Sequence, residues 1–153
     1  MRRSKQLAVA LQKLGLERGT RVATLCWNHH VHHEAYFGIP CGGFVLHTLN
    51  LRLHPNDLAY IATHADDRVV IVDRSLLPLL EQFKDRTNIE HVFVVEDSYE
   101  ELLATASPDE WHDPGLDENE AAAMCYTSGT TGLPKGVVYS HRSTVLHALG
   151  VGV

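Results

Sequence analysis

Residues 69–73 read VVIVD, four aliphatic side chains in a row with no polar alternation. Such a run predicts a strand buried on both faces, as in parallel sheets that are covered by helices. Comparable short runs occur at 21–27, 44–50 and 91–96, and two more, 121–125 and 136–139, flank a glycine-rich loop. We expect all of these runs to be strands, and 91–96 to be buried like 69–73.

Helical patterns separate these runs. Leu7, Leu11 and Leu14 recur at i, i+4 and i+7, the stripe of an amphipathic helix packed on a core. Further helices are predicted at about 31–43, ended or kinked by Pro40; from Pro55; at 75–83, with Pro78 in the first turn; at Ser98, which has capping-box spacing to Glu101; and after the cap Ser140. Strands that alternate with helices predict an α/β fold with a largely parallel sheet covered on both faces.

The bulk composition favours an ordinary soluble globular domain. The 153 residues carry 13 Lys and Arg against 19 Asp and Glu, a net charge of -6, and no basic patch is evident, so nucleic acid is not expected as a partner. Three widely spaced cysteines contain no CxxC pair, which suits a reducing, cytoplasmic compartment. No run of about 18 apolar residues predicts a transmembrane segment.

Residues 105–120 contain six carboxylates, two prolines and no Lys or Arg. Like charges repel one another unless they are hydrated, so a solvated surface connection is the favoured interpretation. A metal or acid/base site would need these groups buried and paired, and no apolar flank indicates that.

The loop YTSGTTGLPKGV, residues 126–137, has almost no bulky side chains. Its three glycines allow sharp turns and inward-pointing N–H groups, and its hydroxyls and Lys135 add donors and positive charge. This concavity of donors suits a polyanion, most plausibly the phosphates of a nucleotide, because each charge-assisted hydrogen bond contributes roughly 1.5–3 kcal/mol. Composition alone favours a plain Gly/Ser/Thr hairpin turn equally.

Two familiar phosphate motifs fail here. A Walker loop that starts at Gly129 would need a second glycine where Pro134 stands and a hydroxyl where Gly136 stands. A dinucleotide fingerprint fails as well, because Thr131 stands at its second glycine. Strand-like runs on both sides of the loop also leave no helix N-terminus directly available to a phosphate.

The loop closely resembles the phosphate-binding signature of the adenylate-forming (AMP-binding) superfamily. The upstream segment AYFGIPCGGFVLHTLNLRLHPNDLAYIATHADDRVVIVD and the downstream VVYSHRS are similar to medium- and long-chain fatty acyl-CoA synthetases. The resemblance covers essentially the whole chain. It implies residues 1–153 are the N-terminal part of an AMP-binding domain, clipped at both ends, with the C-terminal domain absent.

This resemblance implies a fatty-acid:CoA ligase that uses ATP, Mg²⁺ and CoA. By the same resemblance, the phosphate-binding residues are Thr127, Ser128, Gly129, Thr130, Thr131, Gly132 and Lys135, with Thr127 also a candidate magnesium ligand. No catalytic residue is assigned, because the family's later segments lie outside the chain. The chain alone is expected to be inactive. A non-catalytic truncated fragment and an amino-acid-activating adenylation domain remain the alternatives, and acyl chain length and oligomeric state are not predicted.

Four histidines lie close together in NHHVHHEAY. On a helix His29 and His33 would share a face, as would His30 and Glu34, and such i, i+4 pairs can bind zinc. The H-E-x-x-H pattern fails, because Phe37 stands where its second histidine would be. A polar helix entrance with partly solvated histidines is the favoured interpretation. His141 and Arg142, just past the glycine-rich loop, could help to position it.

Overall fold

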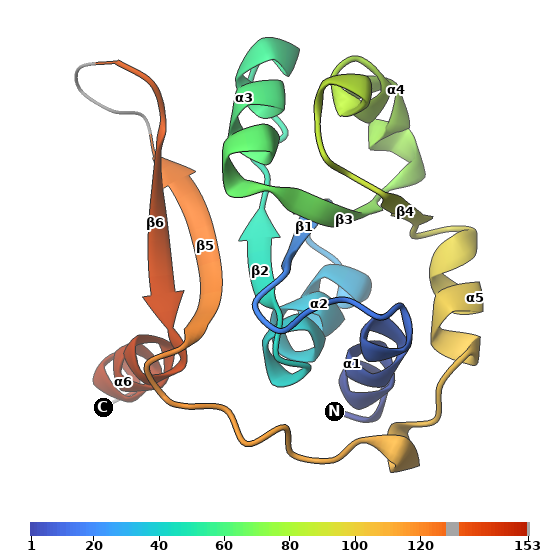
Figure 1. Ribbon diagram of the computed structural model, residues 1–153, viewed down its shortest axis with the longest axis vertical. Helices are drawn as coiled ribbons and strands as arrows, with labels where there is room; N and C mark the ends of the chain where they lie inside the picture. The colour runs from blue at the N-terminus through green and yellow to red at the C-terminus, as the bar shows by residue number, and fades with distance from the viewer. Residues whose placement is uncertain (128–131, 153) are drawn as a thin grey trace.

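A computed structural model describes residues 1–127 and 132–152 of the chain. Its centre is a six-stranded sheet in the order β4-β3-β1-β2-β5-β6 (Figure 1). The first five strands of this order are mutually parallel and β6 is antiparallel to β5, which confirms the predicted largely parallel sheet. The strands are β1 (Arg21–Leu25), β2 (Val45–Thr48), β3 (Asp67–Val72), β4 (His91–Val94), β5 (Ala121–Thr127) and β6 (Lys135–Ser140).

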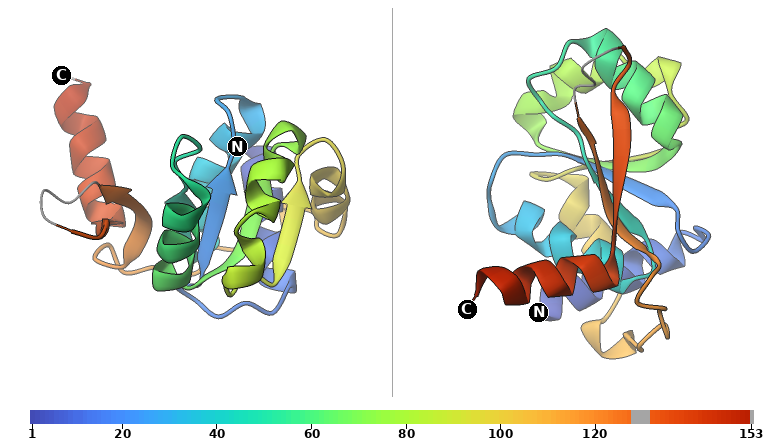
Figure 2. Two further views of the ribbon diagram at one scale, coloured as in Figure 1. Left: turned by 90° about the horizontal axis from the view of Figure 1, so that it is seen from above. Right: turned by 90° about the vertical axis from the view of Figure 1, so that its left-hand side faces the viewer.

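Helices cover both faces of strands β1 to β4 (Figure 2). One face carries α1 (Arg2–Lys13), α2 (His30–Cys41) and α5 (Ser98–Ala104), and the other carries α3 (Pro55–Ala65) and α4 (Leu77–Glu81). Three short 3-10 helices lie at Arg74–Leu76, Lys84–Arg86 and Pro108–Glu110. The last helix, α6 (His141–Val151), projects away from the sheet.

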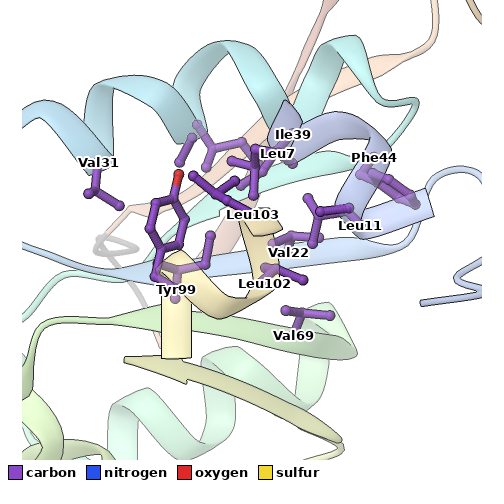
Figure 3. Packing of buried hydrophobic residues seen from close by; sticks show 14 of the residues in the cluster. Leu7, Leu11, Val22, Val31, Ile39, Phe44, Val69, Tyr99, Leu102 and Leu103 are labelled. Carbon is purple, nitrogen blue, oxygen red and sulfur yellow. The ribbon is translucent and has the colours of Figure 1, made fainter. Parts of the chain in front are cut away.

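Alternate side chains of each central strand enter opposite cores, as the two-residue period of a strand requires. In β3, Val69 and Ile71 face the core under α1, α2 and α5, while Val70 and Val72 face the core under α3 and α4. All four side chains are fully buried. The apolar run that predicted a doubly covered strand therefore has a partner layer on each side, and Figure 3 shows the layer that Val69 enters.

Several predicted helix ends are confirmed. Pro55 occupies the first turn of α3 and Pro78 that of α4, where the missing proline N–H leaves no helical hydrogen bond unmade. The Ser140 side chain accepts from the Ser143 N–H and caps α6. Pro40 lies inside α2, which continues for one more residue and ends at Cys41.

Two sequence predictions are wrong. Ser98 does not form a capping box with Glu101, because its hydroxyl accepts from the Val94 N–H at 2.9 Å and the N-cap is Asp97. The capping box of this region is formed by Ser107 and Glu110 instead. The strand predicted at 91–96 is only half-buried, because β4 is an edge strand with a neighbour on one side.

Tyr99 of α5 is a fully buried phenol whose hydroxyl donates to Glu34 Oε2 at 2.9 Å. Figure 3 shows its ring among the aliphatic side chains of this core. Burial, followed by the neighbouring Glu34 charge, raises the pKa of Tyr99 above its usual range. The unfolded chain therefore loses this proton at lower pH than the folded protein does.

This difference predicts an alkaline loss of stability. The contribution of Tyr99 is fully present below the unfolded tyrosine pKa of about 10 and falls as pH rises above it, by up to about 1.4 kcal/mol per pH unit. Tyr99→Phe removes this titration, so its free energy of unfolding should fall less steeply above about pH 10. The measurement is urea unfolding across pH. Tyr36→Phe, at a half-exposed position, should keep the wild-type slope, and an equal slope in Tyr99→Phe would contradict the prediction.

Candidate functional site

The glycine-rich loop spans the end of the β5–β6 hairpin. Register pairs run from Ala121↔Ser140 at the base to Thr127↔Lys135 at the far end. The two predicted strands on either side of the loop are therefore confirmed. Of the predicted phosphate-binding residues, Ser128, Gly129, Thr130 and Thr131 lie outside the described residues.

The structure describes the remaining three predicted residues, Thr127, Gly132 and Lys135, and all three lie at the loop end of the hairpin. Thr127 and Lys135 are directly paired across the two strands, and both are exposed. Within residues 1–127 and 132–152, Lys135 forms no ion pair. Gly132 has φ +119°, a conformation that side chains other than hydrogen rarely adopt. A hydroxyl oxygen and an ammonium group thus face the same space, a donor set that fits a phosphate chain and its magnesium ion.

Tyr126 fastens this end of the hairpin to the body of the molecule. Its hydroxyl lies 2.6 Å from His64 Nδ1 of α3, and its ring lies 5.4 Å from that of His47 of β2. The ring also covers Gly136, where a Cβ atom would come within 3.2 Å of Tyr126 Cζ. Gly136 is therefore small because an aromatic ring lies over it. The sequence carries no local signal for this role of Tyr126, since its partners His47 and His64 are remote in the chain.

Beneath Tyr126 lies a fully buried polar pair, His47 on β2 and Asp67 on β3. His47 Nδ1 lies 2.8 Å from both carboxylate oxygens of Asp67, and neither side chain is exposed to solvent. Burial raises the pKa of Asp67, and the hydrogen bond from His47 opposes that rise. His47 Nε2 has no hydrogen-bond partner among the described residues. A lone histidine inside the apolar run 44–50 was the available signal for this pair.

The clustered histidines do not act through the i, i+4 pairs that their spacing suggested. His29 is the N-cap of α2: its Nδ1 accepts from the His32 N–H, and its Nε2 lies 2.7 Å from Asp73. His30 and His33 are exposed, in line with a polar and partly solvated helix entrance. Arg142 binds Glu118, within the acidic segment, at 2.6 Å, and its side chain forms no hydrogen bond to the described residues of the hairpin.

The part of the chain that the structure describes contains no helix that could span a membrane. None of its helices has both the length and the apolar character that crossing a bilayer requires.

Comparison with known proteins relates the whole chain to one family of enzymes. Residues 1–152 match the family model of the AMP-binding enzymes. The chain is 46% identical over 160 residues to a 3-methylmercaptopropionyl-CoA ligase of Ruegeria lacuscaerulensis, covering 95% of this chain and 29% of that protein. It is 47% identical over 160 residues to a long-chain-fatty-acid–CoA ligase of Thermus thermophilus, covering 99% of this chain and 29% of that protein.

A solved structure shows the same arrangement of helices and strands. The anthranilate CoA ligase AuaEII, in complex with anthranoyl-AMP, superposes with a TM-score of 0.89 at 27% identity, covering 96% of this chain and 29% of that one. The chain thus spans a little under a third of the length of each of these three proteins. The family model and the relatives agree with the resemblance carried by the loop: the chain belongs to the AMP-binding enzyme family.

Proposed function

We propose that the protein carrying this chain is a fatty-acid:CoA ligase. In the first half-reaction a carboxylate oxygen of the acid attacks the α-phosphorus of ATP, and pyrophosphate leaves. In the second, the thiol of CoA attacks the carbonyl carbon of the acyl-adenylate, and AMP leaves. Membership of the AMP-binding family and acyl-CoA ligases as relatives support this sequence of steps.

The observation that carries the proposal is the pairing of Thr127 with Lys135 across the mouth of the glycine-rich hairpin. We assign the β- and γ-phosphates of ATP to residues 127–132, with Lys135 compensating the negative charge that builds up on the departing pyrophosphate. A bound Mg²⁺ would share this neutralisation, and Thr127 is our candidate for a protein ligand to it. The chain's own contribution is therefore positioning and charge compensation.

The fatty acid is the finer part of the proposal. The relatives named above act on 3-methylmercaptopropionate, long-chain fatty acids and anthranilate, so the family alone leaves the acid open. The resemblance of residues 35–73 and 137–143 to fatty acyl-CoA synthetases is what favours a fatty acid.

Acid-dependent ATP–pyrophosphate exchange tests this assignment in a full-length protein that contains the chain. Octanoate and palmitate should give the highest kcat/KM in a panel that also holds 3-methylmercaptopropionate, anthranilate and the common amino acids. Preference for an amino acid would replace the ligase by an amino-acid-activating domain. Absence of exchange with every acid would overturn the adenylation itself.

We further propose that residues 1–153 alone are inactive and that additional chain, including a C-terminal domain, completes the site. Apolar side chains of β6 and α6 are largely exposed, among them Val138, Leu146 and Leu149. Further chain packed on this face would bury them. A solvated connecting role for residues 105–120 and a cytoplasmic location are also proposals, the latter supported by three free cysteines.

A further inference from the structure

Three metal-ligating side chains meet where β1 and β3 end side by side. Cys26 follows β1, Asp73 follows β3, and His29 precedes the first turn of α2. One ligand atom from each, a sulfur, a ring nitrogen and a carboxylate oxygen, lie within 4.8 Å of one another. The two strand ends are joined directly, because the Asp73 N–H donates to the Leu25 carbonyl at 3.2 Å.

This meeting point is the topological switch of the sheet. The chain leaves β1 through α2, toward the face covered by α1 and α5, whereas it leaves the neighbouring β3 toward α4 on the opposite face. Adjacent parallel strands whose connections diverge in this way leave a crevice at their carboxyl ends, and α/β proteins commonly bind ligands there. Cys26, His29 and Asp73 lie at these carboxyl ends.

We propose that Cys26, His29 and Asp73 bind one zinc ion. A mixed thiolate, imidazole and carboxylate set suits Zn²⁺ better than the all-oxygen preference of Mg²⁺ or Ca²⁺. Zinc bonds of about 2.0–2.3 Å place tetrahedral ligand atoms about 3.5 Å apart. The present separations, from 2.7 Å between His29 Nε2 and Asp73 Oδ1 up to 4.8 Å, reach that spacing through shifts of about 1 Å. Water supplies the fourth ligand.

The site is held in place and still reachable. Cys26 and Asp73 are 6% and 3% exposed, and the Trp27 N–H donates to Asp73 Oδ2 at 2.6 Å, which fixes the carboxylate and leaves its other oxygen for the metal. The His29 side chain is 26% exposed and borders a surface depression of about 290 Å³ that is also lined by Asn28 and Tyr36. A hydrated cation can therefore approach from the His29 side.

Zinc binding displaces one proton on each of two ligands, Cys26 and His29. Binding releases the Cys26 thiol proton to solvent and ends the thiol's 3.4 Å hydrogen bond to the Ile71 carbonyl. The His29 proton that faces Asp73 moves from Nε2 to Nδ1, so the ring stays neutral and Nε2 becomes the ligand. The cap from the His32 N–H to Nδ1 is lost, and at 3.4 Å it is already long.

Zinc alone, without ATP or acid, tests the site, so its outcome is separate from that of the proposed function. The chain should bind one Zn²⁺, measured by competition with a chromophoric chelator, and Co²⁺ should give thiolate-to-cobalt charge-transfer absorption. Cys26→Ser should abolish this absorption, and His29→Gln and Asp73→Asn, which remove direct ligands, should weaken Zn²⁺ binding by at least the roughly 10–100-fold that loss of an outer-shell partner costs. Circular dichroism verifies folding of each variant, and Cys26→Ala replaces Cys26→Ser if that variant does not fold.

Cys41→Ser and Cys125→Ser are the matched controls, and both should retain the metal and the absorption. His33→Gln, on the exposed side of α2, should also bind zinc normally. Absence of Zn²⁺ binding by the wild-type chain overturns the proposal. So does a charge-transfer absorption that survives removal of the Cys26 thiol, or an affinity that His29→Gln leaves unchanged.

Discussion

Lys135→Ala should slow ATP–pyrophosphate exchange by about 10²–10³-fold in a full-length protein that contains this chain. The expected loss is that of one charged donor aimed at the phosphates, in a site where catalysis rests on positioning and charge compensation. Lys135 is exposed at the hairpin end, so its truncation removes no core contact. The thermal midpoint should therefore stay within the wild-type range while kcat falls.

Two further variants sharpen this prediction. Lys135→Arg keeps the charge and changes the geometry of the donors, so part of the activity should return. Lys5→Ala removes a lysine from α1, remote from the hairpin end in Figure 1, and should leave exchange unchanged. Wild-type exchange rates in Lys135→Ala would contradict the proposal that this hairpin binds the phosphates of ATP.

Asp67→Ala should destabilise the fold by about 3–5 kcal/mol, because it leaves His47 buried without its partner. His47→Leu leaves the Asp67 carboxylate buried without a partner and should destabilise the fold by a similar amount. Combining Asp67→Ala with His47→Leu should cost much less than the sum of the two, since no polar group of the pair is then left unsatisfied. Urea unfolding of the four proteins completes the double-mutant cycle.

Glu90→Ala is the matched control for this cycle. It breaks the ion pair between Glu90 and Arg68, the residue next to Asp67, where the two side chains are 55% and 40% exposed. Screening by solvent limits the expected loss to about 1 kcal/mol or less. A cost for Asp67→Ala no greater than that of Glu90→Ala would show that the buried pair contributes little.

The sheet and its covering helices were predictable because their signals are local. The run 69–73 carries its double burial in consecutive residues, and Pro55 and Pro78 mark helix starts by their own chemistry. Ser98 shows the limit of such signals, since its hydroxyl closes a bond to a residue four positions earlier in place of capping a helix. Edge position, which leaves β4 half-buried, is a property of the whole sheet.

The polar sites outside the loop were not predictable, because their members are distant in the chain. His47 and Asp67 are 20 residues apart, and His29 and Asp73 are 44 apart. Each partner alone is an unremarkable histidine or aspartate in or beside an apolar run. Only the strand order, with β3 beside β1 and β1 beside β2, brings these side chains together.

The two ends of the β5–β6 hairpin are attached to the rest of the sheet differently. β5 is in register with β2 through Leu46↔Ala123 and His47↔Met124, whereas β5 and β6 are paired continuously from Ala123↔Tyr139 to Thr127↔Lys135. The pairing of the hairpin with β2 therefore ends at Met124, and beyond that point Tyr126 connects the hairpin to the rest of the molecule through its contacts with His47 and His64. Because Thr127 and Lys135 are paired with each other and neither β5 nor β6 is paired with β2 beyond Met124, these contacts of Tyr126 determine where both residues lie relative to the sheet.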